Sequence, residues 1–266
     1  MGTVQSADGT TIAFETWGDG RQPLIMVDGA TAHRAVSQLN APVGELLGDA
    51  FRLYAYDRRG RGESGDTGPY AVQREIEDLA AVIDEAGGSV PVCGFSSGAV
   101  LCLDAAAAGL PISKLALFEP PFVVDDSRPP LPDDYVERLD TANAAGRPGD
   151  AVELFMTAAA GMPAEFVGGM RPSPFWPVLE AVAPTIAYDG RFMGTTMSGR
   201  PLPTDRWADV KVPTLVMYGK GTAPWLIAAA QALAELLPTA TLQPVEAEQH
   251  NVAADVLAPV LREFAG

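Results

Sequence analysis

The chain has 266 residues, of which 47% are hydrophobic and 20% are charged, a composition typical of globular proteins. This length is sufficient for one domain with a full hydrophobic core, or for one domain with an insertion. The formal net charge is −16. A surface of this charge repels nucleic-acid phosphates and anionic lipids, so neither nucleic acid nor a membrane is expected as a partner.

No targeting or membrane-spanning segment is expected. Residues 1–9 contain neither the basic nor the apolar region of a secretory signal. The richest apolar stretch, residues 99–110, includes Asp104 and falls short of the roughly 20 residues that cross a bilayer. Cys93 and Cys102 lack a metal-like spacing to histidine, and we expect them to be small core residues rather than a disulfide. The sequence thus predicts a cytoplasmic protein without metal or cofactor.

Strand and helix patterns alternate in the first half of the chain. Apolar runs predict strands over residues 11–17, 23–27, 51–56, 90–93 and 114–118, the first as the edge strand of a hairpin. Apolar residues at helical spacing predict a helix from Val72 to Gly87-Gly88, and a second helix is expected over residues 97–108. This order predicts an α/β fold with a mostly parallel, twisted sheet and helices on both faces.

The alternation stops at residue 122 and resumes at residue 208. The segment between is rich in proline and carries helical patterns at residues 135–145 and 151–160. A structureless loop of this length is improbable in a compact domain. Strands over 213–218 and 241–245 and helices over 225–237 and 253–264 then follow. We therefore predict a core domain of residues 1–121 and 208–266, with residues 122–207 inserted as a helical cap.

A serine stands at the turn between a predicted strand and a predicted helix. The sequence Gly94-Phe95-Ser96-Ser97-Gly98 fits the pattern G-x-S-x-G, which has mechanical meaning in this context. The sharp turn strains the central residue, and glycines two residues away on either side remove side chains that would collide. Ser96 is the predicted nucleophile; the alternative is a strand-to-helix turn that happens to carry serine.

A serine hydroxyl needs a base to accept its proton, and the chain has two histidines. His250 follows the last predicted strand, which places it at the carboxyl edge of the sheet, where Ser96 also lies. We predict that His250 is this base, the alternative being a histidine in a surface loop. For His33 we expect a structural or substrate-orienting role, or a role in proton transfer.

These elements resemble the α/β-hydrolase superfamily, in its cap-bearing, esterase-like branch, over nearly the whole chain outside the cap. Residues 27–30, Val-Asp-Gly-Ala, resemble its oxyanion loop. Residues 57–64 resemble the D-x-R-G-x-G-x-S stretch of cap-bearing members, and their charges are expected to hold that loop together. The resemblance implies that the backbone amides of Ala30 and Ser97 form an oxyanion hole. We assign Asp28, His33, Phe95 and Trp225 to the substrate pocket.

The chain departs from this superfamily at the acid of the catalytic triad. Most members carry an aspartate after the strand that corresponds to residues 213–218, whereas residues 219–225 read Gly-Lys-Gly-Thr-Ala-Pro-Trp. Glu119, at the end of the strand over 114–118, is the best substitute, since some members, including certain haloalkane dehalogenases, carry their acid there. The alternatives are a structural Glu119 paired with Arg128, and the acids Asp125 and Asp126.

Two further expectations concern the surroundings of the site. Asp28 stands where many members have histidine, and as an anion it would disfavour an oxyanion unless it turned away to pair with Arg34 or Arg58. The aromatic and methionine side chains of the cap are expected either to form core or to line an apolar pocket. They are Phe166, Phe175, Trp176, Tyr188, Phe192, Met162, Met170, Met193 and Met197.

Together these features predict a serine hydrolase of the esterase or thioesterase kind (EC 3.1). It would cleave an ester, thioester or lactone of a small to medium apolar substrate through an acyl-enzyme on Ser96. Two alternatives remain: other chemistry in the same pocket, such as carbon–carbon bond cleavage, acyl transfer or cyclisation in secondary metabolism, and a catalytically silent ligand-binding protein. The expected partner is a small-molecule substrate, and no oligomeric state is predicted.

Overall fold

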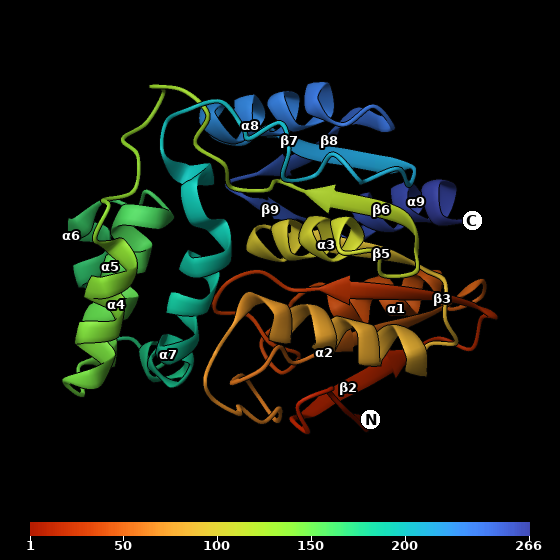
Figure 1. The fold of residues 1–266 in the computed structure, drawn as a ribbon, viewed down its shortest axis with the longest axis horizontal. Helices are drawn as coiled ribbons and strands as arrows, with labels where there is room; N and C mark the ends of the chain where they lie inside the picture. The colour runs from red at the N-terminus through yellow and green to blue at the C-terminus, as the bar shows by residue number, and fades with distance from the viewer.

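The computed structural model describes all 266 residues and is built on one nine-stranded sheet (Figure 1). Its strand order is β1-β2-β4-β3-β5-β6-β7-β8-β9. Every pairing from β4 to β8 is parallel, and the pairings of β1 with β2, β2 with β4 and β8 with β9 are antiparallel. The predicted α/β class with a mostly parallel sheet is confirmed.

Seven of the nine strands and four of the five covering helices lie close to predicted positions. The strands are β1 (Gly2–Gln5), β2 (Thr11–Trp17), β3 (Gln22–Val27), β4 (Phe51–Tyr56), β5 (Val90–Phe95), β6 (Ile112–Phe118), β7 (Thr214–Gly221), β8 (Ala240–Glu248) and β9 (Asn251–Val252). The covering helices are α1 (Asn40–Leu47), α2 (Val72–Glu85), α3 (Ser97–Ala107), α8 (Pro224–Leu236) and α9 (Ala254–Ala265).

Two hydrophobic cores lie on opposite faces of the sheet. The first contains buried side chains of α2, α3 and α8, and the second contains those of α1 and α9. The central strands are buried on both sides for this reason, as their continuous apolar runs predict. Cys102 lies in the first core and Cys93 in the second, both as free thiols, so their assignment to the core is confirmed.

The segment between β6 and β7 is helical. It contains α4 (Tyr135–Ala144), α5 (Pro148–Leu154), a π-helix (Phe155–Ala159), α6 (Ala164–Met170), α7 (Trp176–Met193) and a 3-10 turn (Gly194–Met197). In Figure 1, α7 lies between the core and the layer formed by α4, α5 and α6. These helices all fall within residues 122–207, the segment proposed as a cap. None of the helices combines the length and apolar character needed to cross a lipid bilayer.

Three elements differ from the sequence-based expectation. The hairpin is confirmed, but β2 is not its edge strand, because β2 pairs with β1 on one side and β4 on the other. Helix α1 is unpredicted, because Gly44 interrupts its apolar pattern. Glycine is needed at this position, since a Cβ on Gly44 would lie 2.4 Å from the Cβ of Trp17. Helix α7 is also unpredicted, since Pro184 lies inside it and Pro177 occupies its first turn, where proline is favourable.

Candidate active site

Ser96 sits on a strained turn between β5 and α3, as predicted. Its backbone has φ 53° and ψ −126°, a conformation that residues other than glycine rarely adopt. A Cβ on Gly94 would lie 2.6 Å from the Cα of Ala99, and a Cβ on Gly98 would lie 2.5 Å from the carbonyl oxygen of Val27. The backbone therefore packs too closely for any residue but glycine at these two positions.

Glu119 and His250 meet at the carboxyl edge of the sheet. The Oε2 atom of Glu119 lies 2.5 Å from Nδ1 of His250. The side chain of Glu119 is fully buried, and its other oxygen, Oε1, accepts a hydrogen bond of 2.8 Å from the backbone amide of Gly219. The hydroxyl of Thr222 lies 3.3 Å from Oε2. The segment of residues 219–225, which lacks the expected aspartate, thus holds Glu119 in place through the amide of Gly219 and the hydroxyl of Thr222.

The alternative partner of Glu119 lies elsewhere. Arg128 donates hydrogen bonds to the carbonyl oxygens of Ala158 (2.5 Å) and Ala159 (2.9 Å), at the end of the π-helix. Its guanidinium carbon also lies 4.5 Å from the ring centre of Trp225 in α8. Arg128 therefore connects the segment proposed as a cap to the core and forms no ion pair with Glu119.

Backbone strain is concentrated in this region. All the non-glycine residues with positive φ lie just after β3, β5, β6 and β8: Thr31 (62°), Ser96 (53°), Glu119 (46°), Gln249 (51°) and His250 (63°). Each such residue costs on the order of 1–3 kcal/mol and persists only where the surrounding structure holds it. The strained backbone conformations are thus concentrated at the ends of the strands that carry the predicted site residues.

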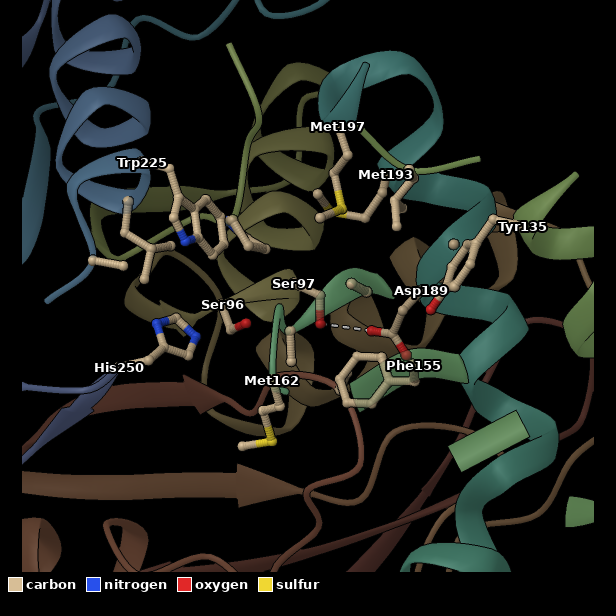
Figure 2. A pocket seen from close by; sticks show the side chains of 18 of the residues that line it. Ser96, Ser97, Tyr135, Phe155, Met162, Asp189, Met193, Met197, Trp225 and His250 are labelled. Atoms are coloured by element: carbon tan, nitrogen blue, oxygen red, sulfur yellow. Dashed lines mark hydrogen bonds between the residues drawn. The ribbon is translucent and has the colours of Figure 1, made fainter. Parts of the chain in front are cut away.

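A cavity of about 380 Å³ opens beside Ser96 and His250 (Figure 2). This volume is in the range of small-molecule sites. Both predicted oxyanion residues, Ala30 and Ser97, line it, as does Trp225. The remaining wall is largely apolar and includes Leu131, Tyr135, Phe155, Met162, Met193, Met197 and Leu226. Three methionines of the cap segment therefore face the cavity, whereas Phe166 and Phe175 are exposed and Trp176 and Phe192 are core residues.

The amides of Ala30 and Ser97 are free. Neither donates a hydrogen bond within the protein, and Ser97 begins α3, whose first turn leaves amides unsatisfied. The loop that carries Ala30 approaches the serine closely, because a Cβ on Gly29 would lie 2.8 Å from the Cβ of Ser96. Two unpaired donors thus flank the Ser96 side chain, which is the arrangement that stabilises a developing oxyanion.

The hydroxyl of Ser96 makes no hydrogen bond in this structure. The imidazole of His250, which also lines the cavity, faces the Ser96 side chain (Figure 2). The His250 side chain is 36% exposed, so water reaches the site. Contacts of this kind are often loose in the absence of substrate and tighten when it binds.

Three residues assigned to the substrate pocket do not line the cavity. Asp28 is 7% exposed and turns away to accept hydrogen bonds from Asn40 Nδ2 (3.0 Å) and Ser37 Oγ (3.4 Å), so it pairs with neither expected arginine. Burial raises the pKa of Asp28, although the hydrogen bond from Asn40 opposes this effect. His33 lies outside the lining. Phe95 packs against Phe118 in the core beneath the sheet, with ring centres 5.8 Å apart.

Within the charged stretch of residues 57–64, Asp57 accepts a 2.9 Å hydrogen bond from the backbone amide of Glu63, as expected of charges that hold this loop together, and further ion pairs join the stretch to neighbouring elements. Asp57 accepts hydrogen bonds from the backbone (2.8 Å) and side chain (2.9 Å) of Arg34. Arg59, fully buried, makes a bidentate pair with Asp78 at 2.7 and 2.8 Å. Arg58 makes a second bidentate pair, with Glu75.

Asp189 of α7 is a cavity residue that the sequence did not reveal. It accepts a 2.6 Å hydrogen bond from the hydroxyl of Ser97 (Figure 2) and forms ion pairs with Arg58 (2.8 Å) and Arg61. Burial acts to raise the pKa of Asp189, but the two guanidinium charges outweigh it and hold this pKa below its usual value. The only signal in the sequence is one acid within the run Thr-Ile-Ala-Tyr-Asp, in a helix whose prolines conceal it.

Comparisons with known proteins support one family. The model of the alpha/beta hydrolase family matches residues 24–260. An alpha/beta hydrolase from Sphaerobacter thermophilus DSM 20745 is 53% identical, with a TM-score of 0.90 over 99% of each chain. The enol-lactonase from Burkholderia xenovorans LB400 (20% identity, TM-score 0.68, 98% of each chain) and a thermophilic esterase from Thermogutta terrifontis (23%, 0.66, 100% of this chain and 99% of that one) share the fold. No curated protein matches the chain.

Proposed function

Because the chain belongs to the alpha/beta hydrolase family, we propose that it is a serine hydrolase that cleaves an ester, thioester or lactone of a small to medium apolar compound. The observation that carries this proposal is the contact between buried Glu119 and His250, beside the cavity that holds the strained Ser96. Esterase- or thioesterase-like activity (EC 3.1) is the form that we expect.

In the first half of the reaction, Ser96 Oγ attacks the carbonyl carbon of the substrate. A carboxylate at Glu119 accepts a hydrogen bond from the N–H group at Nδ1 of His250, which keeps the proton on Nδ1 and leaves Nε2 as the acceptor for the serine proton. The amides of Ala30 and Ser97 donate to the oxyanion, and the N-terminus of α3 adds its partial positive charge. The protonated imidazole then gives its proton to the leaving oxygen or sulfur, and an acyl-enzyme remains on Ser96.

In the second half, water replaces the leaving group. The partly exposed edge of His250 gives water access to the acyl carbon, and the imidazole takes its proton as the water attacks. Collapse of the second tetrahedral intermediate returns the proton to Ser96 and releases the acid. The predominantly apolar wall, with Phe155, Met193 and Trp225, favours substrates with hydrocarbon rather than charged groups.

Replacement of Ser96 tests this proposal. Ser96→Ala should reduce the hydrolysis of p-nitrophenyl butyrate by at least about 10³-fold, and a fluorophosphonate probe should label the wild-type protein at Ser96. Ser127→Ala is the matched control, since Ser127 lies exposed in a loop away from the cavity and should leave turnover unchanged. Equal turnover by Ser96→Ala and wild type, or absence of labelling at Ser96, would contradict the proposal.

A further inference from the structure

We propose that Asp189 is a positioning residue that holds both donors of the oxyanion hole, so that helix α7 of the cap segment sets the geometry of the core's catalytic centre. The inference rests on the proposed serine hydrolase function and adds to it a residue on a separate part of the fold. Asp189 has no direct contact with Ser96 or His250; its effect is transmitted through Ser97 and Arg61.

The first link fixes the donor next to the nucleophile. The hydroxyl of Ser97 donates a 2.6 Å hydrogen bond to Oδ1 of Asp189, and the backbone amide of the same Ser97 is one of the two free donors (Figure 2). Hydrogen bonds to an ionised acceptor are short and strong. The anchored side chain therefore limits rotation of the backbone at the first residue of α3, where no intrahelical bond holds the amide.

The second link fixes the other donor through one peptide plane. Arg61 Nη2 pairs with Oδ2 of Asp189, and its Nη1 donates a 2.7 Å hydrogen bond to the carbonyl oxygen of Gly29. That carbonyl and the amide of Ala30 belong to the same planar peptide unit, in which the C=O and N–H bonds point in opposite directions. Holding the Gly29 oxygen on Arg61 thus determines where the Ala30 amide points.

The network is buried and charge-balanced. Asp189 is 4% exposed and Arg58 and Arg61 are each 1% exposed, with Glu75 as the second acid. Two acids and two guanidinium groups compensate one another, so the ionised form of Asp189 is stable in this interior. Arg61 also donates to Thr185 Oγ1 (3.0 Å), one turn earlier on α7. The docking of α7 and the geometry of the oxyanion hole therefore depend on the same contacts.

Two variants and one matched control test the inference on p-nitrophenyl butyrate. Asp189→Asn removes the charge, and Ser97→Ala removes one hydroxyl while keeping the amide. Asp104→Asn is the control, because Asp104 is also a buried acid (9% exposed) that pairs with an arginine, Arg206 (2.7 Å), but neither of these two side chains lines the cavity. Asp189→Asn should lower kcat at least about tenfold and Ser97→Ala about fivefold, with KM within twofold, because misplaced donors weaken only the transition state.

The rate of fluorophosphonate inactivation should fall in parallel with kcat, since phosphonylation uses the same donors. Asp104→Asn should lower Tm but leave kcat within twofold. The kcat of the double variant Ser97→Ala/Asp189→Asn should lie within about twofold of that of Asp189→Asn. Both changes break the same hydrogen bond between Ser97 and Asp189, so their effects should not add. If Asp189→Asn does not fold, the rates of Ser97→Ala alone decide the matter.

A folded Asp189→Asn variant with kcat within threefold of wild type would overturn the inference, as would an equal loss of kcat in Asp104→Asn. These outcomes leave the proposed function intact, since wild-type turnover and labelling continue. A wild-type protein that neither hydrolyses esters nor reacts with the probe would overturn the proposed function and the inference together.

Discussion

Glu119 binds His250 across an intervening strand: Glu119 directly follows β6, His250 follows β8, and β7 lies between them in the sheet. An aspartate after β7 would be one strand nearer to the imidazole. The longer glutamate side chain, together with the left-handed backbone of Glu119 at φ 46°, spans the additional strand. The Glu119 carboxylate also accepts a hydrogen bond from the backbone amide of Gly219, a residue of the intervening strand β7.

This geometry predicts a large effect of Glu119→Gln. A glutamine keeps the size of the side chain but removes the charge that orients His250 and stabilises its protonated form. We expect kcat/KM for p-nitrophenyl butyrate to fall by at least about 10²-fold, with the fold intact by circular dichroism.

Glu246→Gln is the control for this variant. Glu246 lies on β8 and pairs with Lys220, but its side chain is 72% exposed and it is absent from the cavity wall, so activity should not change. A loss of less than about threefold in Glu119→Gln would remove Glu119 from the proposed triad.

The same relationship explains how much of the site could be predicted from the sequence. Ser96 and His250 follow from a local motif and from chain order, because parallel strands bring their carboxyl ends to one edge. Glu119 follows from the resemblance to the superfamily, some members of which carry their acid after the corresponding strand, together with the lack of an acid in residues 219–225. The residues of the pocket wall could not be predicted in the same way. Phe95 is adjacent to Ser96 in sequence, but the alternation of side chains along β5 places it in the core. Asp189 is far from Ser96 in sequence and reaches the cavity from α7.

The glycines of the elbow predict a stability effect. In Gly98→Ala, the new Cβ would lie 2.5 Å from the carbonyl oxygen of Val27, a backbone atom that cannot give way. We expect the free energy of unfolding to fall by about 2–3 kcal/mol or more, measured by urea denaturation. Gly168→Ala in α6 is the matched control, because its Cβ meets nothing within 4 Å. That change should be neutral or stabilise by up to about 1 kcal/mol, and similar losses in both variants would contradict this account.

Arg128 predicts an effect on substrate binding. Its planar guanidinium contacts two carbonyl oxygens of the π-helix and the face of Trp225 at once, so it joins two walls of the cavity. A lysine cannot make all three contacts, and Arg128→Lys should raise KM for p-nitrophenyl esters about threefold to tenfold with kcat nearly unchanged. Arg138→Lys, on the exposed surface of α4, should leave both constants unchanged. A change in kcat alone would contradict a role in shaping the cavity.

Asp28 predicts a pH-dependent stability. Burial raises the pKa of Asp28 in the folded protein, so the folded state holds its proton at pH values where the unfolded chain has lost it. The wild-type protein therefore loses stability as pH rises from the unfolded pKa through the raised pKa. Asp28→Asn cannot ionise and should have a higher Tm than wild type at pH 8, with the difference shrinking toward pH 4. Asp133→Asn, on the surface, should follow the wild-type profile, and a lower Tm of Asp28→Asn at every pH would contradict the prediction.

The cavity wall predicts discrimination against anionic substrates. No lysine or arginine lines the cavity, and its one carboxylate, Asp189, is already bound by Ser97 and two arginines. An ionised substrate carboxylate would lose its hydration here without gaining a cationic partner, at a cost of several kcal/mol, and each 1.4 kcal/mol is about tenfold in affinity.

We therefore expect mono-p-nitrophenyl glutarate to be hydrolysed with a kcat/KM at least about 100-fold lower than that of its methyl ester, methyl p-nitrophenyl glutarate. The two substrates share length and leaving group and differ in the charge and its methyl cap, so steady-state rates at pH 7.5 isolate the electrostatic effect. Equal values of kcat/KM for the two substrates would contradict this account of the cavity wall, because Arg58 and Arg61 are both held in buried ion pairs and do not line the cavity.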